Sequence, residues 1–185
     1  FYPVHDNQHA LKTNLSVQEW CGHVYTQLNN RDAFEVVSHS YFEGEADEKI
    51  QLDKHLLENE LWTKIRIDPD ALPVGSFKII PALEYFRLKH IPIQAFEAEA
   101  TLQTNDETTT YTLAYVNTER RLSITFTTDF PYRIEGWEES FKSGFGNNAK
   151  TMVSSAERIS TIKTAYWKQN DNGHVKIRER LGLDP

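Results

Sequence analysis

The sequence predicts a mainly β fold, in which a large twisted antiparallel sheet closes partly into a barrel or a sandwich and one or two short helices cover an open edge or mouth. Three observations predict this class. Short runs of alternating apolar and polar residues dominate the middle of the chain, turn-forming residues separate these runs, and segments with helical periodicity are few. At 185 residues the chain is long enough to bury a substantial core, and we expect a single domain over residues 1–185.

The first predicted element is a β-hairpin. Residues 17–28 and 33–43 are rich in aromatic and β-branched side chains, which favour strands. Residues 29–32, Asn-Asn-Arg-Asp, form a connection of hairpin length between them. The two runs are therefore expected to pair with each other.

A helix of about three turns is predicted next, over residues 52–64, with Asp53 as the N-cap. Asp68-Pro69 has the pattern of a cap followed by proline at the first helical position, and Pro73 would end that single turn. Residues 76–90 are expected to form a long strand. Pro81 would mark a bulge or an edge position in this strand, because proline cannot donate a hydrogen bond to a neighbour.

A three-stranded meander is predicted over residues 96–102, 110–116 and 121–127. In each run the apolar side chains fall on alternate positions, so that one face of the strand is expected to be buried in the core and the other to be exposed to solvent. Polar turns separate the three runs. Two later strands are expected over residues 132–137 and 161–167.

The charge balance argues against a nucleic-acid partner. The chain has 20 basic and 27 acidic side chains, a formal charge of −7, and such a surface repels phosphate unless its basic residues are segregated. The densest basic stretch lies in a predicted terminal helix over residues 175–181, where Glu179 interrupts it. No run of about 18 apolar residues occurs, so the sequence predicts no transmembrane segment.

Acidic runs and histidines give no defined catalytic or metal site. Carboxylates cluster at residues 43–48, at Glu58 and Glu60, and around Trp137, and charge runs of this kind are expected to be solvated faces. His5 and His9 have a spacing that two zinc ligands on one helix could use, but their context favours a polar loop. The phosphate-loop, dinucleotide and nucleophile-elbow motifs are absent, and we expect no metal and no cofactor.

One alternative function is a hydrolase. On a single strand, Glu19, Cys21 and His23 would project from the same face, and a remote carboxylate could complete a Glu/His site. A small buried cysteine beside a hydrogen-bonded histidine is the other interpretation of the same pattern. Cys21 is the only cysteine, so no internal disulfide is possible.

The favoured function is a non-enzymatic binding or interaction module. Aromatic side chains are abundant, with 10 Phe, 8 Tyr and 4 Trp, in an otherwise acidic chain. An aromatic-lined concave face would bind an apolar, lipid-like ligand or a glycan. The candidate ligand-binding residues are Trp20, His23, Tyr25, Trp62 and Trp137. Ordinary core packing of these aromatic residues, in a purely structural protein, is the alternative.

Five segments carry a resemblance to a known family: FYPVHDNQHALK, QEWCGHVYTQLNNR, SYFEGEAD, ENELWTKIRIDPDALPVG and FPYRIEGWEESFKSG. Together they resemble a Bacteroidetes-type family of bacterial envelope lipoproteins of unknown function, often mislabelled septum formation inhibitor Maf. The resemblance implies a location in the cell envelope, in the periplasm or anchored to the outer membrane, and a longer chain of which this is the C-terminal part. It assigns no catalytic residues. The predicted architecture is also similar to the open half-barrels of periplasmic lipoprotein carriers.

Overall fold

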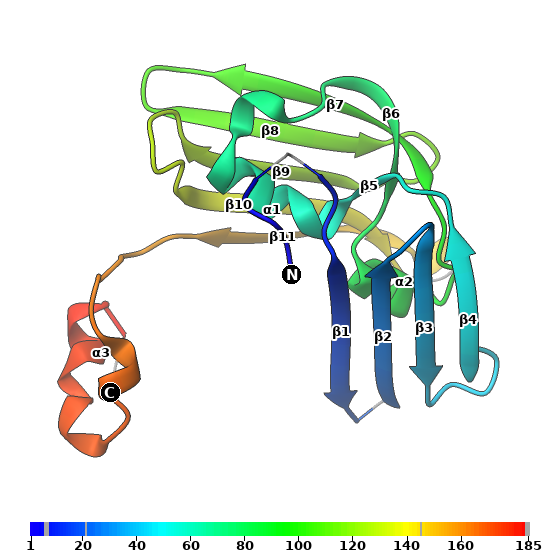
Figure 1. Ribbon diagram of the computed structural model, residues 1–185, viewed down its shortest axis with the longest axis horizontal. Coiled ribbons are helices and arrows are strands. Elements are labelled where there is room, and N and C mark those ends of the chain that lie inside the picture. Colours follow the sequence, from blue (N-terminus) through cyan, green and yellow to red (C-terminus); the bar gives the residue numbers. More distant parts are fainter. Residues whose placement is uncertain (6–7, 21, 145, 184–185) are drawn as a thin grey trace.

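A computed structural model describes residues 1–5, 8–20, 22–144 and 146–183. This part of the chain contains eleven strands in two sheets (Figure 1). The first sheet is antiparallel with the order β1-β2-β3-β4, formed by β1 (Lys12–Glu19), β2 (Gly22–Asn30), β3 (Phe34–Ser40) and β4 (Asp47–Leu52).

The second sheet curls into a half-barrel and has the order β11-β10-β9-β8-β7-β6-β5. Only the short β5 pairs in parallel, with β6, and the other neighbours are antiparallel. The predicted mainly β class is thereby confirmed. The seven strands are β5 (Leu56–Leu57), β6 (Gly75–Ile80), β7 (Phe96–Thr104), β8 (Thr108–Tyr115), β9 (Arg121–Thr127), β10 (Ile134–Ser143) and β11 (Lys150–Glu157).

Three short α-helices accompany the sheets in the described residues: α1 (Glu58–Ile67), α2 (Leu83–Lys89) and α3 (Lys176–Arg180). None of them is long or apolar enough to cross a membrane. Single 3₁₀ turns are η1 (Pro69–Ala71), η2 (Gly146–Asn148), η3 (Tyr166–Lys168) and η4 (Asn172–His174). The chain after β11 runs away from both sheets and carries α3 (Figure 1).

The concave face of the half-barrel is filled by α1. Leu61 and Ile65 lie one helical turn apart and are fully buried against the inward-facing residues of β7, β8 and β9. These inward residues alternate along each strand, as the meander pattern predicted, and the three strands of the meander are confirmed. The buried strand residues are Ala98, Ala100, Tyr111, Leu113, Tyr115, Leu122, Ile124 and Phe126.

A second core joins the two sheets. Phe34 and Leu28 of the first sheet pack in one cluster with Ile80 of β6 and Phe86 of α2. Polar contacts strengthen this junction, because Arg87 of α2 forms an ion pair with Glu19 at the end of β1. Helix α2 is therefore held by both sheets, and its position is fixed relative to α1.

The predicted strand over residues 17–28 is wrong, because the chain reverses inside it. Strand β1 ends at Glu19 and β2 begins at Gly22, and the two pair with each other, with Gln18 opposite His23. Gly22 has a φ of 142°, a conformation that L side chains rarely adopt, which allows this tight reversal. The predicted hairpin is confirmed for β2 and β3, whose connection is residues 31–33.

The predicted helix over residues 52–64 starts too early. Residues 53–55 have no regular secondary structure, Leu56–Leu57 form β5, α1 begins at Glu58, and Asp53 is not its N-cap. Of the leucines that suggested the helix, Leu56 and Leu57 form β5 and Leu61 lies in α1. The N-cap, Leu57, has no polar side chain, and the buried Glu60 carboxylate accepts its backbone N–H at 3.1 Å. Helix α1 then runs to Ile67, and the predicted turn after Asp68 is confirmed as η1.

Other strand boundaries also differ from the predictions. The long strand over residues 76–90 is wrong after Ile80, because Pro81 ends β6 and α2 follows. The strand over residues 161–167 is wrong, since no ladder partner exists there and η3 occupies its end. Strands β4 and β11 were not predicted, because both are mostly exposed and lack clear alternation. The late strand around Trp137 and the terminal helix are confirmed as β10 and α3.

Candidate functional site

The main cavity lies where α1 and α2 leave part of the concave face uncovered, next to the Arg120 turn and strands β9 and β10. Its volume is about 590 Å³, which is within the size range of small-molecule sites in proteins. Aromatic and aliphatic side chains form a large part of its wall: Trp62, Tyr85, Leu88, Leu122, Trp137 and Phe141.

Strand β10 contributes three consecutive inward positions, Trp137, Glu139 and Phe141. Trp137 is the register partner of Ile124, and Glu139 is the partner of Leu122. Partners across an antiparallel pair project to the same face, so these side chains share the concave side with the core of β9. The intervening Glu138 projects to the opposite face and is exposed.

Two tryptophans from distant parts of the sequence meet in the cavity wall. The Trp62 ring on α1 lies 6.5 Å from the Trp137 ring, in an edge-to-face arrangement at 83°. Both are only partly buried and pack against the core of the half-barrel. This aromatic pair therefore presents apolar surface to the cavity while its other side is supported by packed side chains.

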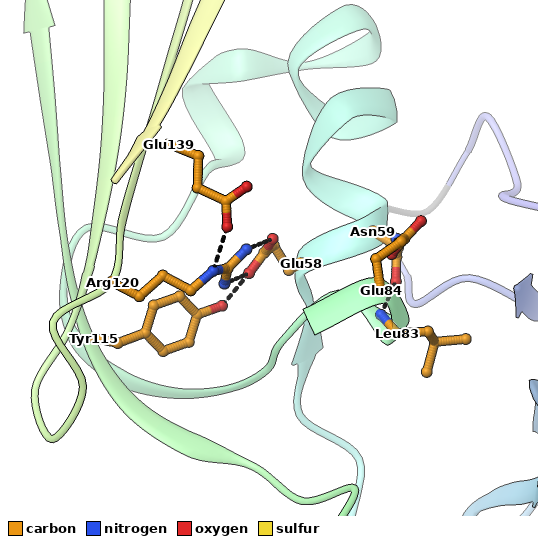
Figure 2. A network of polar contacts seen from close by, with 7 residues as sticks. All are labelled: Glu58, Asn59, Leu83, Glu84, Tyr115, Arg120 and Glu139. Atoms are coloured by element: carbon orange, nitrogen blue, oxygen red, sulfur yellow. Dashed lines mark hydrogen bonds and ion pairs between the residues drawn. The ribbon is translucent and has the colours of Figure 1, made fainter. Parts of the chain in front are cut away.

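A buried ionic network forms the floor of the cavity (Figure 2). Arg120, in the turn between β8 and β9, binds both oxygens of Glu58 at the start of α1, and its Nη2 lies 2.6 Å from Glu58 Oε1. The Tyr115 hydroxyl donates to Glu58 Oε2. Arg120 Nε donates to Glu139 Oε1 at 2.6 Å. Glu58 and Arg120 are 3% and 4% exposed, so this pair is out of water and each charge depends on the other.

The Arg120 guanidinium lies over two tyrosine rings, with ring centres 4.7 Å away for Tyr85 and 4.9 Å for Tyr115. Burial alone would lower the pKa of Arg120, but its hydrogen bonds with Glu58 and the charge of that carboxylate raise it overall. Burial raises the pKa of Tyr115 well above its usual value, and the nearby Glu58 charge raises it further, although Arg120 acts in the opposite direction.

Together with a second buried tyrosine, Tyr115 predicts how the free energy of unfolding changes at alkaline pH. Burial also raises the pKa of Tyr111, whose hydroxyl donates to the Pro73 carbonyl at 2.8 Å. Above about pH 10, the unfolded chain loses these two phenolic protons while the folded protein keeps them. The folded state then binds more protons than the unfolded state, so stability falls as the pH rises.

We therefore expect the free energy of unfolding of Tyr111→Phe to fall less steeply between pH 10 and 11 than that of the original protein. The stability difference between the two proteins should change by about 1 kcal/mol over this pH unit, because a tyrosine in the unfolded chain, with a pKa of about 10, is only partly ionised there. Urea unfolding at several pH values measures it, with Tyr166→Phe as the exposed control. Equal slopes for Tyr111→Phe and the original protein would contradict the assignment.

The mouth of the cavity is held by contacts between the two helices. The Asn59 side chain of α1 accepts the backbone N–H of Leu83 at 3.3 Å and donates to Glu84 Oε2 at 3.4 Å (Figure 2). On the other side, the Lys89 ammonium donates to the Lys142 carbonyl and lies 5.6 Å from the centre of the Phe141 ring. These contacts keep α2 close to β10 without closing the space between them.

The structure brings together two of the five residues predicted to bind a ligand, Trp62 and Trp137. Trp20 is fully exposed at the β1–β2 turn, and His23 and Tyr25 lie on the exposed face of β2. The predicted aromatic surface is therefore divided between two separate regions. The cavity contains the pair from α1 and β10.

The residues of the alternative Glu/His site are not neighbours on one strand. Glu19 lies on β1 and binds Arg87, whereas His23 lies on β2 opposite Gln18. Cys21 lies outside the described residues. His9 Nδ1 is 2.9 Å from Glu60 Oε1, and no group of three metal-ligating side chains is found within the described ranges.

Sequence reasoning missed the charged floor of the cavity. It treated Glu58 and Glu60 as members of a solvated acidic face, and this was wrong, because both carboxylates are buried with specific partners. Arg120 lies in a turn and was not predicted as a functional residue. A weak signal was present in β10, where Trp137, Glu139 and Phe141 share one face by their spacing alone.

No family model, no curated protein and no solved structure matches this chain. The family resemblance of the five sequence segments therefore stays a prediction.

Proposed function

We propose that this protein is a non-enzymatic binding module whose cavity takes a small amphipathic ligand. The observation that carries the proposal is an aromatic-walled space of about 590 Å³ above a preorganised ionic floor. The apolar part of the ligand would lie against Trp62 and Trp137, and its polar part would face Glu139. Sites that combine apolar walls with a few fixed polar groups are typical of ligand-binding proteins.

The polar groups of the cavity favour binding over catalysis. Both oxygens of Glu58 are engaged by Arg120, and one of them also accepts from Tyr115. A carboxylate held in this way has a structural role and offers no free oxygen to a substrate. The hydrolase alternative needs Glu19 and His23 to act together, and their different contacts give it no geometric support.

The proposal is tested with N-phenyl-1-naphthylamine, a neutral apolar probe whose fluorescence rises in a dry environment. We expect saturable binding, and we expect Trp137→Ala to weaken it about tenfold, because truncation removes one face of the cavity wall. Trp20→Ala is the matched control and should bind as the original protein does, since Trp20 is exposed at a distant turn.

Two results would contradict the binding function. Absence of saturable binding would favour the purely structural alternative. Equal weakening by Trp20→Ala and Trp137→Ala would place the probe elsewhere on the surface.

We also propose a location in the cell envelope, which rests on the family resemblance of the five segments. Native mass spectrometry of the protein, purified gently from its own source and compared before and after organic extraction, would detect a resident ligand. Loss of a discrete mass of several hundred daltons, with a lipid or glycan in the extract, would support both the binding function and the ligand class.

A further inference from the structure

We infer that the cavity selects a positively charged ligand, a cationic amphiphile that carries an amine or quaternary ammonium group next to an apolar part. This inference rests on the proposed function, because it names the charge of the ligand that the cavity would bind. The feature behind it is the Glu139 carboxylate, which stands between two aromatic rings on β10.

The charges that line the cavity sum to a negative value. Three acidic side chains and two basic ones contribute to it, which leaves an excess of one negative charge: Glu58, Glu84, Glu139, Lys89 and Arg120. A cation entering this space restores neutrality, whereas an anion would add to the excess.

Both basic side chains are already engaged by the protein. Arg120 binds Glu58 through two nitrogens and Glu139 through Nε, and its guanidinium lies over two tyrosine rings. Lys89 donates to the Lys142 carbonyl and lies over Phe141. An anionic ligand that bound Arg120 would have to displace a carboxylate from it, which leaves an uncompensated buried charge.

Glu139 is the acidic group best placed to meet a ligand. Its side chain is 26% exposed, against 3% for Glu58. Arg120 occupies Oε1, and no other described residue donates a hydrogen bond to Glu139. The second oxygen is therefore the available acceptor for an ammonium group.

Aromatic rings stand on both sides of this carboxylate. Trp137 and Phe141 are two residues away along β10, about 6 to 7 Å in each direction. The Lys89 ammonium group already lies over the Phe141 ring. Among the described residues, no lysine or arginine lies over Trp62 or Trp137. An ammonium group bound to Glu139 comes within reach of the Trp137 ring, and tryptophan is the strongest partner for such contacts.

Isothermal titration calorimetry below the critical micelle concentration tests the inference with three probes of similar chain length: dodecyltrimethylammonium, dodecyl maltoside and dodecanoate. We expect the ammonium probe to bind about tenfold more tightly than the maltoside, and dodecanoate to bind most weakly. Glu139→Gln should weaken the ammonium probe about tenfold and the maltoside much less, because only the ammonium probe loses an ion pair. Glu138→Gln, which removes the same charge from the exposed face of the same strand, should change neither.

The outcomes separate this inference from the proposed function. Equal affinity for all three probes, or tighter binding of dodecanoate, would overturn the selection of a cation and leave the binding module intact. Equal weakening of every probe by Glu139→Gln would assign Glu139 a structural role only and would also overturn the inference. If none of the probes binds, both proposals fall.

Discussion

Replacing Arg120 with methionine is expected to lower the free energy of unfolding by about 3 to 5 kcal/mol. The substitution keeps an unbranched side chain of similar length but removes the charge that neutralises Glu58, which is 3% exposed. A carboxylate left alone in this position must stay charged without a partner or take up a proton, and both raise the free energy of the folded state. Urea unfolding at pH 7 measures the loss.

A double variant of Glu58 and Arg120 distinguishes the effect of an unpaired buried charge from the effect of changed packing. When Glu58→Leu is combined with Arg120→Met, the fully buried carboxylate is removed together with its partner, and only the partly exposed Glu139 loses a contact. The double variant should therefore be more stable than Arg120→Met alone. Glu138→Gln, a charge change on the exposed face of β10, should alter stability by less than about 0.5 kcal/mol. A loss below about 1 kcal/mol for Arg120→Met would show that water reaches Glu58 and that the floor is not preorganised.

The parts of the fold that the sequence predicts well are those with local signals. The meander of β7, β8 and β9 combines strict alternation with polar turns, and its inward residues form the core found in the structure. The turn between β1 and β2, in contrast, was not predicted from the sequence. Aromatic and β-branched residues on both sides of Trp20 continue the strand pattern, and Gly22 was the only sign that the chain reverses.

The candidate site depends on contacts between distant residues, which local patterns do not encode. Glu58 and Arg120 are 62 positions apart and meet because α1 lies on the concave face beside the β8–β9 turn. In the sequence, Glu58 is an ordinary acidic residue near a helix start, and Arg120 is an ordinary turn residue. Trp62 and Trp137 were identified as aromatic candidates, but only the packing of α1 on the half-barrel shows that these two form a pair.

Replacing Glu60 with alanine is expected to lower the free energy of unfolding by about 3 to 5 kcal/mol, because its carboxylate satisfies two buried backbone donors from distant parts of the chain. It accepts the Ala10 backbone N–H at 2.7 Å and the Leu57 backbone N–H at 3.1 Å, and it lies 2.9 Å from His9 Nδ1. The first of these contacts holds the N-terminal segment, and the second caps α1. Alanine leaves both backbone groups buried without an acceptor.

Hydrogen exchange gives the local readout that global unfolding does not. In Glu60→Ala, the amide protons of Ala10 and Leu57 should exchange faster than the amides of the β7–β9 meander, because the loss begins where the acceptor is removed. Glu60→Gln keeps one acceptor oxygen and should fall between the original protein and Glu60→Ala. Glu99→Ala, on the exposed face of β7, controls for the loss of one negative charge. Unchanged exchange at Ala10 and Leu57 would mean that water replaces the carboxylate and that Glu60 does not position α1. In that case the placement of Trp62 and Glu58 at the cavity would depend on the packing of Leu61 and Ile65 alone.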